Sequence, residues 1–107
     1  MEILKISINA RSSKFKELLR TCRAITDQTR QKTGCKSSRL AQDNGNENII
    51  TLEQQWEERS SLDSYFRSDL FSALMGGITW LGQTYEIRIN GCTQEEGRDA
   101  VKRAREI

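Results

Sequence analysis

The hydrophobic period of this sequence changes along the chain, and the order of those changes constrains the fold more than any other feature. Residues 2–9 alternate apolar and polar side chains, which predicts a strand with one apolar face. From Phe15 the apolar residues recur at steps of three and four. This spacing predicts a helix that begins after a hydroxyl cap at Ser12 or Ser13 and ends before Gly34.

The rest of the chain predicts further strands and helices. Strands are expected over residues 35–42, 48–56 and 83–90. A turn at residues 43–46 would join the first two of these strands. A helix that starts near Ser60 is expected to stop or kink at Gly76-Gly77, because glycine costs about 1 kcal/mol inside a helix. A charged helix should close the chain after a capping box at residues 93–96.

This order of elements predicts an α+β, ferredoxin-like β-α-β-β-α-β fold with an antiparallel sheet. Residues 1–91 are expected to form the domain, and residues 92–107 a C-terminal helical extension that either frays or docks on a partner subunit. Helices cover one face of such a sheet, while Ile and Leu occur on both faces of several strands. A homodimer with its sheets stacked face to face, a dimeric α/β barrel, is therefore expected.

The composition excludes several classes of function. The 107 residues include no histidine, which removes Ser-His-Asp and Cys-His nucleophile pairs and histidine zinc sites. The cysteines form no C-x-x-C pair, so no metal site is expected, and reduced thiols favour a cytoplasmic location. No run approaches about 18 apolar residues, so no membrane association is expected. A net charge of +2 without an aromatic-rich basic motif indicates no nucleic-acid partner.

Four stretches carry a resemblance to a known family: the opening strand with its helix, Gly34-Cys35, Leu52-Glu53-Gln54-Gln55-Trp56-Glu57, and Ser68-Asp69-Leu70-Phe71. Over about residues 1–91 the chain resembles the antibiotic biosynthesis monooxygenase domain, a dimeric ferredoxin-like family. The resemblance implies a cofactor-independent monooxygenase that acts on a small aromatic quinol or polyphenol. No bound cofactor is expected.

Two positions depart from the family's pattern. Tyr65 stands where members often carry a histidine, and Met75 stands where the haem-degrading branch carries its iron-ligating histidine. A thioether is a poorer ligand than imidazole for that chemistry, so haem degradation is not expected. The missing imidazole also removes the side chain best suited to proton transfer near neutral pH. An alternative is therefore a non-catalytic homodimeric module of the same fold, which either binds a small molecule or has a regulatory role.

The candidate site residues follow from the resemblance. Tyr65 is the candidate hydrogen-bonding or proton-relay group and Arg88 the candidate anion stabiliser. The candidate substrate-binding residues are Trp56, Phe66, Phe71, Met75 and Trp80. Each also has a purely structural interpretation: the aromatic residues and Met75 as packing, and Arg88 as the partner of an acid. A pocket filled by Trp56, Phe66 and Phe71 would favour the binding module.

Overall fold

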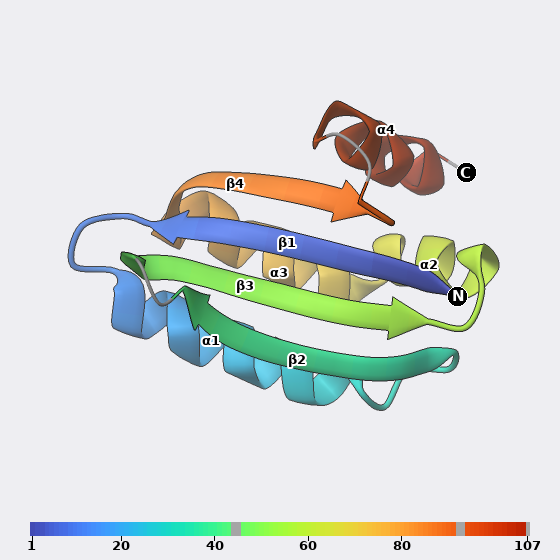
Figure 1. Cartoon of the computed structure of the whole chain (residues 1–107), viewed down its shortest axis with the longest axis horizontal. Coiled ribbons are helices and arrows are strands. Elements are labelled where there is room, and N and C mark those ends of the chain that lie inside the picture. Colours follow the sequence, from blue (N-terminus) through green and yellow to red (C-terminus); the bar gives the residue numbers. More distant parts are fainter. Residues whose placement is uncertain (44–45, 92–93, 107) are drawn as a thin grey trace.

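The computed structural model describes residues 1–43, 46–91 and 94–106. Its elements are β1 (Glu2–Ala10), α1 (Phe15–Thr29), β2 (Cys35–Asp43), β3 (Asn46–Trp56), α2 (Arg59–Phe66), α3 (Asp69–Leu81), β4 (Gly82–Ile89) and α4 (Gln94–Arg105). The strands form one antiparallel sheet in the order β2-β3-β1-β4, as the ferredoxin-like topology requires. Figure 1 shows α1, α2 and α3 against one face of this sheet.

The core lies between the sheet and these helices. Alternate residues of β1, namely Leu4, Ile6 and Ile8, are fully buried against the helices. They face the apolar stripe of α1 and the inner side of α3, whose buried residues are Leu18, Cys22, Ile25, Phe71, Leu74 and Ile78. The change from a period of two to a helical period therefore places one apolar face of each element in a shared core.

The second helical region differs from the prediction. It consists of two helices, because the chain bends between α2 and α3. The Ser68 hydroxyl accepts the Phe71 N–H at 3.1 Å and caps α3. The helix then continues through Gly76-Gly77 to Leu81, so the expected stop there is wrong. The burial of Leu74 and Ile78, one on each side of the glycines, offsets their cost.

The expected cap of α1 is also wrong. Its N-cap is Lys14, which makes no capping hydrogen bond through its side chain, and Ser13 has a positive φ of 63°. The prediction that the helix ends before Gly34 is confirmed, since its last residue is Thr29. Gly34 adopts a φ of +87° in the turn that leads into β2. Residues 44–45 of the expected hairpin turn and Thr93 of the expected capping box lie outside the described residues.

The uncovered face of the sheet is mostly polar. Its residues from β1 and β4 include Lys5, Ser7, Asn9, Thr84, Glu86 and Arg88, and those from β2 and β3 include Arg39, Thr51 and Glu53. Arg39 and Glu53 form an ion pair at 2.6 Å on it. Ile3, which is 41% exposed, and Ile49 are its larger apolar side chains. The expectation of an apolar open face is therefore wrong, because the strands direct most Ile and Leu side chains to the covered side.

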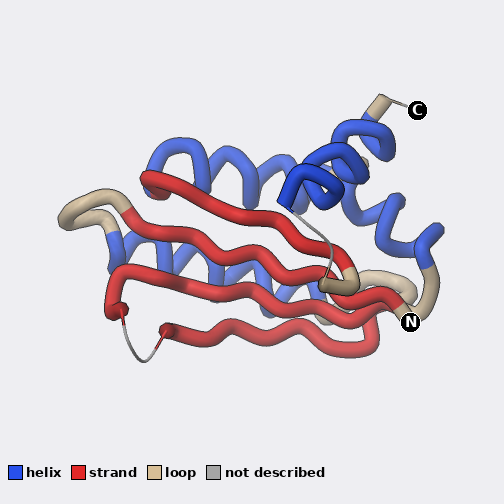
Figure 2. The backbone as a smooth tube through the Cα atoms, turned by 45° about the horizontal axis from the view of Figure 1, so that its top comes forward, coloured by secondary structure: helices blue, strands red, loops and turns tan. Residues whose placement is uncertain are grey.

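The C-terminal helix docks on its own chain. Figures 1 and 2 place α4 beside β4, at the edge of the sheet opposite β2. Ala100 and Ala104 are buried there, and Arg105 donates hydrogen bonds to the Phe66 carbonyl at 2.6 Å and to the Ser72 hydroxyl at 2.8 Å. The helix is therefore not frayed over the described residues, and its docking on a partner subunit stays a prediction. Every helix in the described ranges is too short or too polar to span a bilayer.

Candidate functional site

Four aromatic side chains gather where β3 ends beneath the bend between α2 and α3. We call Trp56, Tyr65, Phe66 and Phe71 the aromatic cluster. Trp56 stacks on Tyr65 with ring centroids 4.9 Å apart, and Phe71 contacts the rings of Tyr65 and Phe66 edge-on at 5.3 and 5.1 Å. All four side chains are at most 2% exposed. The cluster brings together four of the seven site residues predicted from the sequence.

Local structure fixes the geometry of this cluster. Tyr65 and Phe66 close α2, while Phe71 lies in the first turn of α3. Ser68 joins the two helices: its hydroxyl donates to the Tyr65 carbonyl at 2.6 Å and accepts the Phe71 N–H. One serine therefore terminates one helix and caps the next, which turns both sets of rings toward Trp56.

A buried amide links the polar ends of two cluster rings. Gln54 is 1% exposed; its Nε2 donates to the Tyr65 hydroxyl at 3.2 Å, and its Oε1 accepts the Trp56 Nε1–H at 3.1 Å. Gln54 is not among the site residues predicted from the sequence. Its signal is a polar side chain at an inward position of a strand, two residues before Trp56, where the alternation calls for an apolar one.

A cavity of about 220 Å³ opens beside the Trp56–Tyr65 pair. The residues that line it are Lys32, Thr33, Trp56, Ser61, Ser64, Tyr65 and Ser68. Trp56 and Tyr65 form the buried part of this lining, since both residues are nearly inaccessible to solvent. The three serines follow a spacing of three and four residues, which places them on one side of the helical region. This spacing is the sequence signal for the polar rim, and none of the three serines is among the site residues predicted from the sequence.

Burial dominates the electrostatics of the site. Burial raises the pKa of the Tyr65 phenol, and hydrogen bonds with Gln54 and Thr29 oppose that shift. Tyr65 is therefore a neutral hydroxyl at physiological pH, able both to accept and to donate a hydrogen bond. Burial also raises the pKa of Cys22 to about 12, and it raises that of Cys35. Neither thiol is activated as a nucleophile.

Three predicted site residues lie away from this cavity. Arg88 projects from the open face of the sheet, where its guanidinium lies 3.4 Å from Glu86, so it and Tyr65 are on opposite sides of the sheet. Met75 is half-buried on α3, and Trp80 near the end of that helix is 79% exposed. None of the three lines the cavity. Over the described ranges, no three His, Cys, Asp or Glu side chains lie close enough together to hold a metal ion.

Comparisons with known proteins agree with this architecture. Residues 1–76 match the family described as antibiotic biosynthesis monooxygenase. A search of curated proteins gave no match.

Among solved structures, the chain is similar to PA3566 from Pseudomonas aeruginosa, with 24% identity over 82% of this chain and 89% of that chain and a TM-score of 0.75. It is also similar to a conserved protein from Methanosarcina mazei, with 24% identity, coverage of 83% and 90%, and a TM-score of 0.76. A "putative antibiotic biosynthesis monooxygenase" from Deinococcus radiodurans is 15% identical, with coverage of 86% and 92% and a TM-score of 0.80. At these identities the likeness shows a common fold.

Proposed function

The chain belongs to the antibiotic biosynthesis monooxygenase family, and from this premise we propose that it is a cofactor-independent monooxygenase of a small aromatic quinol or polyphenol. The reaction would take place in the cavity beside Trp56 and Tyr65. The observation that carries the proposal is the neutral Tyr65 phenol, which lines a small cavity next to an aromatic wall. Such a site suits a phenolic ring that needs a hydrogen-bond donor and little water.

The chemistry needs few protein groups. The phenol loses a proton, its anion passes an electron to O2, and the two radicals combine at a ring carbon that carries a hydrogen. The resulting peroxide anion takes up a proton, which replaces the one that the phenol lost, and becomes a hydroperoxide. Loss of water from the hydroperoxide leaves a carbonyl at that carbon. One oxygen atom enters the product and the other enters water, and all four electrons come from the substrate. Tyr65 would donate a hydrogen bond to the oxygen that gains charge.

The other candidate residues receive supporting roles in this proposal. Phe66 and Phe71 would hold Tyr65 and Trp56 in place, and Met75 would pack behind them on α3. We assign Arg88 to an interface rather than to the chemistry. The open face carries both signs of charge, including Lys5, Glu53, Glu86 and Arg88. A second copy related by a two-fold axis would set opposite charges against one another, giving the face-to-face homodimer.

One observation favours the second candidate function, a non-catalytic binding module. Trp56, Phe66 and Phe71 are fully buried and the ring of each packs against Tyr65, so these three side chains fill the inner part of the site themselves. The missing histidine removes the usual group for proton transfer at neutral pH. A module of this kind would bind a small aromatic molecule at the Tyr65 edge and leave it unchanged.

Oxygen uptake separates the two functions. A panel of one-ring quinols and polyphenols, without added metal or flavin, should give uptake well above autoxidation. Tyr65→Phe should lower that uptake about tenfold or more, because it removes the hydroxyl. Tyr85→Phe is the matched control, since it removes the chain's other phenol, which lies on β4 outside the cavity lining. Equal uptake by the two variants would contradict the role of Tyr65, and binding without uptake would indicate the module.

Sedimentation at micromolar concentration tests the homodimer independently. The proposal expects a mass of two chains, and Glu53→Lys together with Glu86→Lys should weaken the association by placing like charges in the interface. A monomeric wild-type protein would contradict it.

A further inference from the structure

The cavity beside the aromatic cluster is small. Its volume of about 220 Å³ lies below the range of about 300–1,000 Å³ that is usual for pockets that take drug-sized ligands. Because Trp56, Phe66 and Phe71 already fill the space behind it, the cavity has no room to extend inward. A single aromatic ring with small substituents fits this volume, and a fused polycyclic ring system does not.

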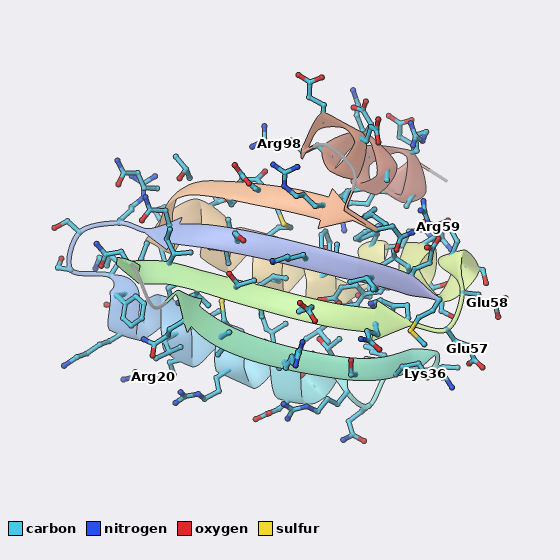
Figure 3. All side chains as sticks on the ribbon, in the orientation of Figure 1. Arg20, Lys36, Glu57, Glu58, Arg59 and Arg98 are labelled. Carbon is cyan, nitrogen blue, oxygen red and sulfur yellow. The ribbon has the colours of Figure 1, made fainter. Side chains whose placement is uncertain are left out.

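The cavity carries one charge. Lys32 is the only charged residue among the described residues that line it, and no described carboxylate forms an ion pair with its ammonium group. Two glutamates at this end of the sheet do not pair with Lys32. Glu57 pairs with Lys36 at 3.8 Å, and Figure 3 labels both at this end of the sheet. Glu58 is the N-cap of α2 and does not line the cavity. An unpaired ammonium group at the rim attracts an anion.

The hydroxyl groups of four serine and threonine residues line the cavity together with this ammonium group. Ser68 already caps α3, and Ser64 lies 3.4 Å from an Arg67 nitrogen. The hydroxyl groups of Ser61 and Thr33 form no hydrogen bond with other described residues. The combination of an ammonium group and two hydroxyls suits a carboxylate, which accepts hydrogen bonds through both of its oxygens.

A glycine brings the two sides of this rim together. Lys32 and Thr33 come from the loop before β2, while Ser61 comes from α2. A Cβ at Gly34 would lie 2.3 Å from the Ser61 Oγ, and Gly34 also has a φ of +87°. Only a residue without a side chain allows the loop to approach α2 this closely. The charge and the hydroxyls therefore belong to one site that the backbone builds.

We propose that this cavity selects a one-ring aromatic acid, with the carboxylate held by Lys32, Ser61 and Thr33 and the ring directed toward Tyr65. This inference rests on the proposed function, because it uses the same cavity and narrows its substrate class to anionic phenols. Lys32 then sets the specificity for a carboxylate, while Tyr65 faces the aromatic ring of the ligand.

Fluorescence of Trp56 provides the binding test. The chain has two tryptophans, and Trp80→Phe removes the exposed one, which leaves Trp56 as the reporter. A dihydroxybenzoate is titrated against the matching uncharged dihydroxybenzamide. The acid should bind more tightly, and Lys32→Ala should weaken binding of the acid about tenfold while leaving the amide unchanged. Lys36→Ala is the matched control, because this nearby lysine pairs with Glu57 and does not line the cavity.

The outcomes separate this inference from the proposed function. Equal binding of acid and amide, equal effects of the two lysine variants, or no binding of either ligand would overturn the selection of an anion. Oxygen uptake that does not discriminate between acid and amide would also overturn it and would leave the monooxygenase proposal standing. Tight binding of the acid that depends on Lys32, without uptake, would support the inference and contradict the oxygenation.

Discussion

Gln54 donates a hydrogen bond from Nε2 to the phenol oxygen of Tyr65 across 3.2 Å, joining β3 to the last turn of α2. Its Oε1 accepts the Trp56 Nε1–H, so one amide serves the polar atoms of two buried rings. A buried polar group without a partner costs about 1–3 kcal/mol. The amide therefore allows Trp56 and Tyr65 to stack out of contact with water beneath the cavity, and it links the stability of the cluster to the position of the phenol.

Gln54→Leu should destabilise the protein. The variant replaces the amide with an apolar side chain of similar size and leaves the Trp56 Nε1–H and the Tyr65 hydroxyl without this partner, so we expect a loss of about 2–3 kcal/mol in the free energy of unfolding. Urea denaturation measures it. Gln55→Leu, on the open face of the same strand, is the control and should change stability by less than about 0.5 kcal/mol. Equal losses in both variants would show that the amide does not support the cluster.

Stability should fall at alkaline pH because of Cys22. Burial raises the pKa of this thiol to about 12 in the folded protein, from 9.0 for a free thiol. The folded state therefore holds the proton more tightly, so the contribution to stability is complete below about pH 9 and is lost as pH rises toward 12. Burial shifts the pKa of Tyr65 in the same direction, which adds to the loss above about pH 10.

The measurement compares urea unfolding at about pH 8 and about pH 10.5. Over this interval wild type should lose about 2 kcal/mol more than Cys22→Ala, since the variant has no thiol to titrate in either state. The comparison concerns the change with pH, so the packing cost of Cys22→Ala cancels. The same pH dependence in both proteins would mean that Cys22 does not contribute to it.

The sequence predicts the elements better than the contacts between them. The alternation of Ile87 and Ile89 with Arg88 already implies that Arg88 points away from the side occupied by the isoleucines, and the structure has it there. The interruption of the second helical region was predicted at the wrong place. Intrinsic propensity favours a stop at Gly76-Gly77, but burial of the surrounding leucine and isoleucine overrides it, and the hydroxyl cap at Ser68 makes the bend.

The aromatic half of the site could be predicted from the sequence, whereas the position of the loop with Lys32 and Thr33 beside it could not. Trp56, Tyr65, Phe66 and Phe71 stand out because large apolar side chains at inward positions must meet in one core. The cavity's charged rim depends on how close a loop comes to α2, and no local pattern specifies that distance. It is set by the positive φ of Gly34 and its contact with Ser61, which are tertiary features.

Arg105→Ala should loosen the bend between α2 and α3. The guanidinium group of Arg105 reaches from α4 to the Phe66 carbonyl and the Ser72 hydroxyl, one on each side of that bend. Hydrogen bonds to a charged group are worth about 1.5–3 kcal/mol when shielded, and solvent screening at this exposed residue reduces that to about 1 kcal/mol. Amide hydrogen exchange over residues 66–72 should be faster in the variant. Arg103→Ala, on the same helix, is the control and should leave exchange there unchanged.

Two glycine-to-alanine substitutions in helices should act in opposite directions. At Gly76 in α3, an added Cβ would meet nothing within 4 Å, so Gly76→Ala should stabilise the protein by about 0.5–1 kcal/mol through helix propensity. At Gly97 in α4, the Cβ would lie 2.1 Å from the Ile87 carbonyl oxygen of β4. Because that neighbour is backbone of the central sheet, α4 would have to move away.

Gly97→Ala should therefore destabilise the protein despite its better helix propensity. Overpacking of this kind costs about 1–3 kcal/mol, which exceeds the gain of about 1 kcal/mol from alanine. Thermal unfolding followed by circular dichroism compares the two variants with wild type, and the midpoint should rise for Gly76→Ala and fall for Gly97→Ala. A rise in both midpoints would mean that α4 does not pack on β4 through Gly97, and the hydrogen bonds of Arg105 to the bend would then lose their structural basis.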